Sequence, residues 1–354
     1  MSQKGVATRL MTRGALALLL ATGACSRPPP SPTSSATPPA PPSAPAPAAT
    51  PVPAATPAPA ATHAAAAGVP TATPGAQASA PLAEGAPQLA DSSDLVHIEY
   101  HVYGHGDPGV ILIHGWACNA RYWSAQVDAL RGQYTVVTLD LAGHGASGRN
   151  RSDWSMLHFG EDVAAVARRL PNATLVLVGH AMGGPVALEA APLIGPRVIG
   201  IIGVDTFRRV GLPPPPSQAV DRQVERFRKD FIGTMHDLAP QLFTRHADPK
   251  LVRKIADDMS RAPPQMAIAS LVSLNTLDYA TVLPRVQAPI VAIDSDLGEP
   301  LDAARIRRAA PGFRAVVLKG AGNFLMLEDP QRFNPILLRE IAALAKAHDA
   351  PASR

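Results

Sequence analysis

Nearly half of the prolines lie in one stretch of the chain, and this stretch limits the folded part to the residues that follow the stretch. Between Pro28 and Pro87 lie 18 of the 38 prolines, with Glu84 as the one charged residue and no aromatic side chain. Such a segment has too few large apolar groups to build a core, and it favours extended polyproline II structure. We therefore expect a spacer over residues 26–90 and one folded domain over residues 91–354, a length typical of α/β folds with a single large core.

The N-terminus resembles a bacterial secretory signal with a lipobox. A basic section precedes the apolar run Gly14–Ala24, which ends directly before Cys25. The run is too short for a permanent span, which needs about 20 helical residues. Thr22 stands where a lipobox usually has Leu. The resemblance implies a signal peptide over residues 1–25 and a lipid-anchored chain at the bacterial cell envelope, either at the outer membrane or facing the periplasm. A plainly secreted chain or an ordinary buried cysteine are the alternatives.

The charge balance of the expected domain argues against a nucleic-acid partner. Residues 1–90 hold 4 basic and 1 acidic residues, which leaves 28 basic and 27 acidic residues for 91–354, so the formal charge of +4 divides into +3 and +1. Nucleic-acid binding needs basic residues gathered on one face of the folded part. The basic residues within 221–230 alternate with acidic ones, a pattern typical of a solvated helix face. Since Cys118 is the one cysteine left in the domain, we expect no disulfide there.

Short apolar strands alternate with amphipathic helices beyond Asp91, the pattern of a mostly parallel, doubly wound α/β sheet with helices on both faces. The expected strands are 110–113, 134–139, 174–178, 198–204, 290–293 and 315–318, and the expected helices are 120–131, 155–170, 182–191, 302–310 and 330–346. The interval 207–284 predicts several helices and no strand, hence a helical cap inserted above the sheet. An adaptable apolar pocket for a small molecule would be lined by Met235, Phe243, Met259 and Met266.

Four glycine-containing motifs follow predicted strands or stand near the C-terminus. They are His114-Gly-Trp116, Asp140-Leu-Ala-Gly-His-Gly-Ala-Ser-Gly148, Gly179-His-Ala-Met-Gly-Gly184 and Gly322-Asn-Phe324. In this order they resemble the α/β-hydrolase family, and the resemblance runs from about residue 94 to residue 347. It implies an α/β-hydrolase-type sheet with a cap.

Two departures from that family decide the functional interpretation. The family places a nucleophilic serine in a strained Gly-x-Ser-x-Gly turn, and this chain has Ala181 at that position. The general base of the family is a histidine in Gly-His-Phe, and this chain has Asn323 there, which carries no titratable nitrogen. Both halves of the Ser–His pair are therefore vacant.

The groups around the vacant pair are retained. The amides of Trp116 and Met182 would form an oxyanion hole, with Met182 at a helix N-terminus. Asp205 and Asp296 are both candidates for the acid, because each follows a predicted strand. We favour Asp205, since the usual acid position after the later strand falls near Gly298.

Other reactive groups offer weaker sites. Cys118 could be a substitute nucleophile near the oxyanion loop, but nothing in its sequence surroundings indicates a lowered pKa. Two histidines, His97 and His101, and two aspartates, Asp294 and Asp296, show no recognised zinc-ligand spacing, so we expect no metal site. No cofactor is expected either.

Three classes of function stay open. We interpret the chain first as a non-catalytic pseudohydrolase that binds a small ligand or a partner at the cell envelope. The second class is an esterase-like serine hydrolase inactivated by substitution, natural or engineered, at Ala181 and Asn323. The third is a cofactor-free lyase or oxygenase that uses Asp205 or a motif histidine. None of the patterns predicts an oligomeric state.

Overall fold

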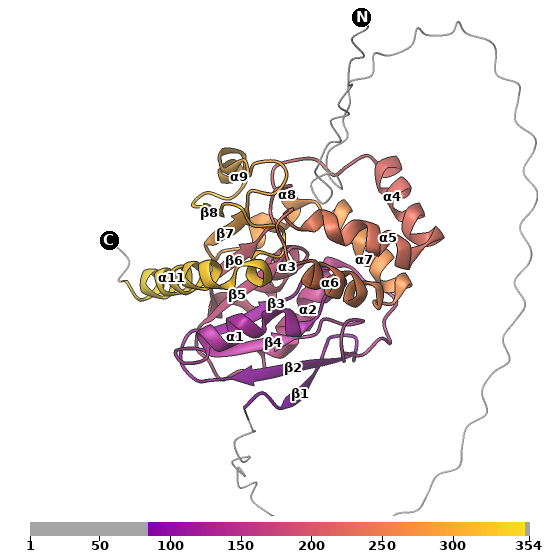
Figure 1. Ribbon diagram of the computed structural model, residues 1–354. Coiled ribbons are helices and arrows are strands. Elements are labelled where there is room, and N and C mark those ends of the chain that lie inside the picture. Colours follow the sequence, from indigo (N-terminus) through magenta and orange to yellow (C-terminus); the bar gives the residue numbers. More distant parts are fainter. Residues whose placement is uncertain (1–83, 351–354) are drawn as a thin grey trace, which may run out of the picture. The chain divides into compact units, whose positions relative to one another are not determined.

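An eight-stranded, mostly parallel sheet organises the computed structural model, which describes residues 84–350 (Figure 1). The strand order is β1-β2-β4-β3-β5-β6-β7-β8. β1 and β2 run antiparallel to their neighbours, and the six strands from β4 to β8 in this order are parallel. The strands are Pro87–Asp91 (β1), His97–Tyr103 (β2), Gly109–Ile113 (β3), Thr135–Leu139 (β4), Leu175–His180 (β5), Val198–Val204 (β6), Ile290–Ser295 (β7) and Arg314–Leu318 (β8).

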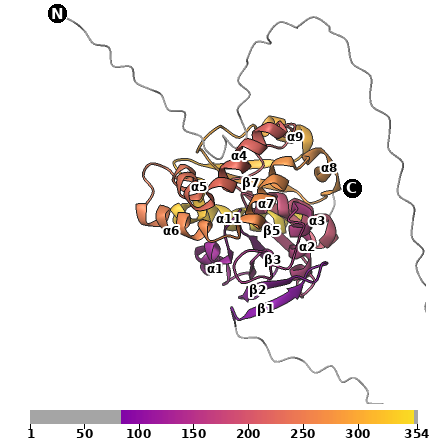
Figure 2. The same ribbon diagram turned by 90° about the vertical axis from the view of Figure 1, so that its right-hand side faces the viewer.

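The central strands are buried along their whole length, as a sheet covered on both faces requires. Every residue of β3, β5, β6 and β7 is buried. Figure 2 shows α1 and α11 on one side of the sheet and α2 and α3 on the other, and the two pairs pack within themselves. These helices are Ser124–Leu130 (α1), Met156–Ala167 (α2), Gly183–Ile194 (α3) and Pro330–Asp349 (α11). Two further helices, Ala303–Ala309 (α9) and Leu325–Glu328 (α10), precede and follow β8. The predicted fold class is confirmed.

The interval between β6 and β7 is helical and contains no strand (Figure 1). Its α-helices are Ser217–Lys229 (α4), Phe231–Leu238 (α5), Pro249–Ser260 (α6), Pro264–Thr276 (α7) and Tyr279–Val282 (α8). The same interval contains the short 3₁₀ helices Ala239–Leu242 and Leu283–Arg285, and two others, Ala120–Trp123 and Gly195–Arg197, lie earlier in the described part of the chain. Across residues 84–350 no single helix is long and apolar enough to cross a membrane. Only a bent pair, α7 with Tyr279–Arg285, meets that length and composition together, at an angle of 74°.

The expected end of the spacer at residue 90 is wrong, because β1 belongs to the sheet. Pro87 to Asp91 pair with β2 in antiparallel register, and the Glu84 carboxylate accepts a hydrogen bond from the Gly104 amide at 3.1 Å. An edge strand of this kind is held by main-chain pairing, so proline-rich composition gives no sign of it. The predicted signal peptide, Cys25 and the rest of the predicted spacer lie outside the described residues.

Candidate active site

A sharp strand-to-helix turn joins β5 to α3 at the vacant nucleophile position. Ala181 has a φ of +46°, in the left-handed region that a residue with a Cβ rarely adopts. The glycines on either side are needed for space. A Cβ at Gly179 would collide with the backbone of Gly183, and one at Gly183 would collide with the carbonyl of Ile113. The turn therefore keeps the strained shape of a nucleophile elbow although an alanine methyl occupies its tip.

The two predicted oxyanion amides lie beside this turn. Within residues 84–350, neither the Trp116 nor the Met182 amide donates to a main-chain carbonyl, so both remain available to an anion. The Trp116 indole Nε1 donates to the carbonyl of Ala267 in α7 at 2.8 Å, and its ring meets the edge of Phe227 in α4 with centroids 5.3 Å apart. Trp116 thus fastens the oxyanion loop to two helices of the cap.

Asn323 is held at the vacant base position by three hydrogen bonds. Its amide N–H donates to the carbonyl of Leu242 at 2.7 Å, and its carbonyl faces Nε2 of His180 at 3.0 Å. Its side-chain Nδ2 donates to Oδ2 of Asp205 at 2.7 Å. The residue is only 2% exposed.

Asp205 is the acid candidate that the structure brings to Asn323. Its Oδ1 accepts hydrogen bonds from Nη2 of Arg208 at 2.9 Å and from the amide and hydroxyl of Ser295 at 3.0 and 2.8 Å. Asp296 lies at the surface, where its Oδ1 accepts from the amide of Gly320 at 2.7 Å. Asp205 contacts Asn323, whereas Asp296 contacts Gly320 at the surface. The spacing of the two aspartates in the sequence could not reveal this difference.

A second buried carboxyl, Asp294, sits next to Asp205 and was missed as a site residue. Its Oδ1 accepts from the amide of Thr206 at 3.2 Å, and its Oδ2 has no hydrogen-bond partner among the described residues. Burial, together with the charge of Asp205, raises the pKa of Asp294 to about 8. Asp294 therefore favours its protonated form at neutral pH. A sequence signal existed in Asp294-Ser-Asp296 at the end of a predicted strand, but it does not show which member points inward.

The remaining titratable groups near the turn are buried. Burial lowers the pKa of His180 to about 4, so its imidazole is neutral. His114 is also buried: its Nε2 accepts from the amide of Leu141, and burial lowers its pKa. Burial raises the pKa of the Cys118 thiol, which donates to the carbonyl of Trp116 at 3.3 Å. Among residues 84–350 no group of three or more His, Cys, Asp or Glu side chains could hold a metal ion.

A small cavity of about 120 Å³ opens at the turn, between the sheet and the cap. The four residues predicted to line it do not. Met235, Phe243, Met259 and Met266 are buried instead, and Phe243 stacks on Phe324 with centroids 5.1 Å apart. The prediction failed because these side chains are packed into the hydrophobic core, and composition cannot distinguish a core residue from a residue of a pocket wall. The cavity is lined by Trp116, Ala181, Met182, Pro185, Asp205, Thr206, Phe207, Arg208, Arg209, Leu271, Leu274, Asn275, Tyr279 and Asn323.

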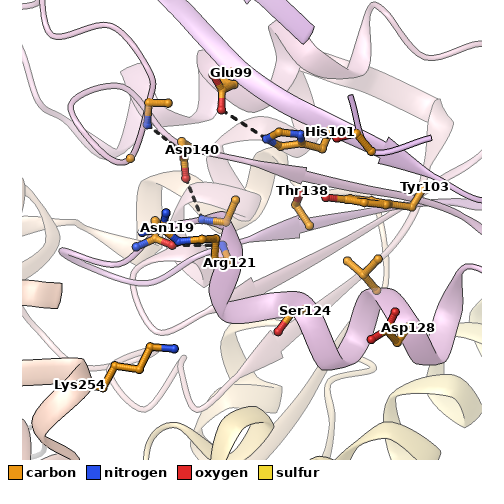
Figure 3. A pocket seen from close by; sticks show the side chains of 15 residues that line it. Glu99, His101, Tyr103, Asn119, Arg121, Ser124, Asp128, Thr138, Asp140 and Lys254 are labelled. Atoms are coloured by element: carbon orange, nitrogen blue, oxygen red, sulfur yellow. Dashed lines mark hydrogen bonds and ion pairs between the residues drawn. The ribbon is translucent and has the colours of Figure 1, made fainter. Parts of the chain in front are cut away.

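A larger hollow of about 870 Å³ lies elsewhere, between β2, the start of α1 and α6 (Figure 3). Charges of both signs line it, and several are already paired. Nε2 of His101 lies 3.3 Å from Glu99, and Asp140 accepts from the amides of Ala120 and Ala146. Lys254 reaches toward it from the cap. None of the vacant, oxyanion or acid positions faces this hollow, so the small cavity is the candidate site.

The chain belongs to the alpha/beta hydrolase family, whose model matches residues 110–336. It is 26% identical over 246 residues to the AB hydrolase superfamily protein YisY of Bacillus subtilis, covering 66% of this chain and 91% of that protein. It is 28% identical to a pimeloyl acyl-carrier-protein methyl ester esterase of Xanthomonas axonopodis, covering 70% of this chain and all of the esterase.

Solved structures agree on the fold. A thermophilic esterase from Thermogutta terrifontis, in a malate-bound structure, superimposes with a TM-score of 0.65 at 24% identity, over 73% of this chain and 99% of that one. A bromoperoxidase from Bacillus anthracis superimposes with a TM-score of 0.63 at 21% identity, over 72% and 99% of the two chains.

Proposed function

We propose that this chain is a non-catalytic member of the hydrolase family that binds a small ligand in the cavity at the elbow. One observation carries the proposal: the frame of the active site is intact while both of its reactive side chains are replaced. Ala181 keeps the strained φ of the elbow, and Asn323 keeps the 2.7 Å hydrogen bond to Asp205.

The two replacements remove covalent chemistry and leave binding. An alanine methyl cannot attack a carbonyl, and an asparagine amide cannot accept the proton of a hydroxyl or a water. In a Ser–His–Asp triad on an unrelated protease fold, loss of the serine or the histidine costs about 10⁶ in turnover. Neither the oxyanion amides nor the cavity requires a serine hydroxyl or a histidine ring, so affinity for a carbonyl-like or anionic ligand can persist.

The alternative is an esterase-like serine hydrolase inactivated at Ala181 and Asn323. The same 2.7 Å bond favours it, because a histidine at position 323 would find Asp205 already in place. The esterases among the similar proteins also support it. The lyase or oxygenase alternative has less support, since both oxygens of Asp205 are occupied and His114 and His180 are buried and neutral.

We also propose that the domain is anchored at the bacterial cell envelope through a lipid on Cys25. The support is the short apolar run that ends in small residues before this cysteine. Mass spectrometry of the purified full chain should find a chain that begins at a lipidated Cys25. An unmodified Cys25 inside an intact chain would contradict the anchor.

An ester-hydrolysis assay tests the vacant site. We expect the unaltered protein to hydrolyse p-nitrophenyl acetate at the background rate. Ala181→Ser alone has no base, and Asn323→His alone has no nucleophile, so each single variant should stay near background. The double variant should exceed either single variant by at least ~100-fold, because residues that act as one unit contribute only together.

The single variants serve as matched controls, and circular dichroism shows that all three variants fold. A folded double variant at background would mean that the site is no longer organised for acyl transfer. Substantial activity of the unaltered protein, lost in Asp205→Ala or Cys118→Ala, would overturn the non-catalytic assignment.

A further inference from the structure

The cavity at the elbow carries two arginines on its wall, and neither belongs to the motifs of the family. Arg208 and Arg209 come from the segment that follows β6. Asp205 is the one carboxylate among the described residues that line the cavity, so the formal charge of its wall is two positive against one negative, or +1. A cavity of about 120 Å³ with an excess positive charge is suited to an anion of similar size.

Arg208 has hydrogen-bonding capacity left after its structural contacts. Its Nη2 donates to Oδ1 of Asp205 and to the carbonyl of Ser295, both at 2.9 Å. Its Nη1 donates to no atom of residues 84–350, and its Nε is buried without a partner there. A guanidinium presents five N–H donors in a planar fork that matches a carboxylate. The Arg208 side chain, 17% exposed, therefore has donors left for a ligand.

Arg209 adds a second, more deeply buried guanidinium to the same wall. The residue is 8% exposed, and its Nη2 donates to the carbonyl of Pro213. Burial lowers the pKa of Arg209. The phenol of Tyr279, 7% exposed, lines the same space.

The apolar part of the cavity wall limits the size and polarity of the group that carries the ligand's negative charge. Pro185, Leu271 and Leu274 present apolar surface, and Ala181 presents a methyl group where the family has a hydroxyl. A cavity of about 120 Å³ is somewhat smaller than the cavity of about 150 Å³ that can hold one benzene molecule. The occupant is therefore a short, unbranched molecule with one charged end and a small apolar part.

We propose that the ligand is a short-chain carboxylate of about two to four carbons, with its carboxylate on Arg208 and Arg209 and its alkyl chain against Leu271 and Leu274. This inference rests on the proposed ligand-binding function and names the chemical class of the ligand. The same molecules are the acid products of short-chain ester hydrolysis, so a hydrolase site without its reactive groups becomes a receptor for them.

Isothermal titration of the full chain with acetate, propionate and butyrate, beside the neutral isostere propionamide, tests the charge requirement. We expect propionate to bind at least about tenfold more tightly than propionamide, a difference of about 1.4 kcal/mol. Arg208→Gln and Arg209→Gln should each weaken propionate binding at least about tenfold and leave propionamide unaffected. Arg222→Gln, an exposed residue of α4, removes the same charge from the cap surface and should change neither.

The outcomes separate this inference from the function on which it rests. Equal affinity for propionate and propionamide would refute the carboxylate assignment and leave ligand binding in the cavity standing. Unchanged propionate binding in folded Arg208→Gln and Arg209→Gln would refute it as well. Failure of both compounds to bind would count against the ligand-binding function itself. If an arginine variant does not fold, the comparison of the two compounds on the unaltered chain still decides.

Discussion

The buried pair Asp205 and Asp294 should give the domain an unusual dependence of stability on pH. The pKa of Asp294 is raised from 3.8 to about 8 by burial and by the neighbouring charge, so the folded chain keeps a proton that the unfolded chain releases above about pH 4. The contribution of this group to stability is therefore fully present below pH 4 and is lost as the pH rises toward 8. Between pH 5 and 7 the loss amounts to about 1.4 kcal/mol per pH unit, the value for one proton.

Asp294→Asn removes this proton uptake while its amide oxygen can still accept from Thr206. The free energy of unfolding of Asp294→Asn minus that of the unaltered protein should rise by about 1.4 kcal/mol per pH unit between pH 5 and 7. Urea unfolding of both proteins at pH 5, 6 and 7 measures this difference, and titrations elsewhere in the chain cancel in it. A difference that stays flat across the range, or falls, would refute the assignment of a protonated Asp294.

Three further measurements test other parts of the structure. Ala181→Gly should raise the free energy of unfolding by about 0.5–1 kcal/mol, because glycine adopts a φ of +46° without strain. A variant that unfolds at a lower urea concentration than the unaltered protein would show that the backbone at position 181 is not strained. Trp116→Phe should cost about 1–3 kcal/mol, because the carbonyl of Ala267 loses its donor, and an unchanged urea midpoint would contradict that role. A chain that begins at residue 92 should melt at a lower temperature than one that begins at residue 84, because it lacks β1, and equal melting temperatures would mean that the β1 pairing adds nothing.

Most of the central fold could be predicted from local patterns in the chain. The apolar run at 110–113 and the alternation of later strands with helices are local, and the observed elements overlap each predicted range. The identity of the vacant positions was equally local, because Gly179 to Gly184 and Gly322 to Phe324 are short motifs whose departures can be seen residue by residue. The spacing of hydrophobic residues and the glycines of turns can be recognised within short stretches of the chain, so no tertiary information is needed to detect them.

The edge and the pocket of the domain could not be predicted in this way. β1 is held by main-chain bonds to β2, which leave no mark on its composition. Whether an apolar side chain of the cap lines a cavity or fills the core depends on what packs against it. Met235 and Met266 fill the core, whereas Leu271 and Leu274 line the cavity, and all four residues belong to helices of similar apolar content.

The sequence by itself predicted the family, the place of the elbow, and alanine and asparagine at positions 181 and 323, since each of these features lies in a few adjacent residues. Only the tertiary structure showed which acid candidate contacts Asn323, through a hydrogen bond between residues 118 positions apart, Asp205 and Asn323. Only the structure placed Asp294 beside Asp205 and two arginines on the cavity wall. The physical reason is that burial, charge proximity and cavity shape arise where distant segments meet, and a linear pattern carries no distance between them.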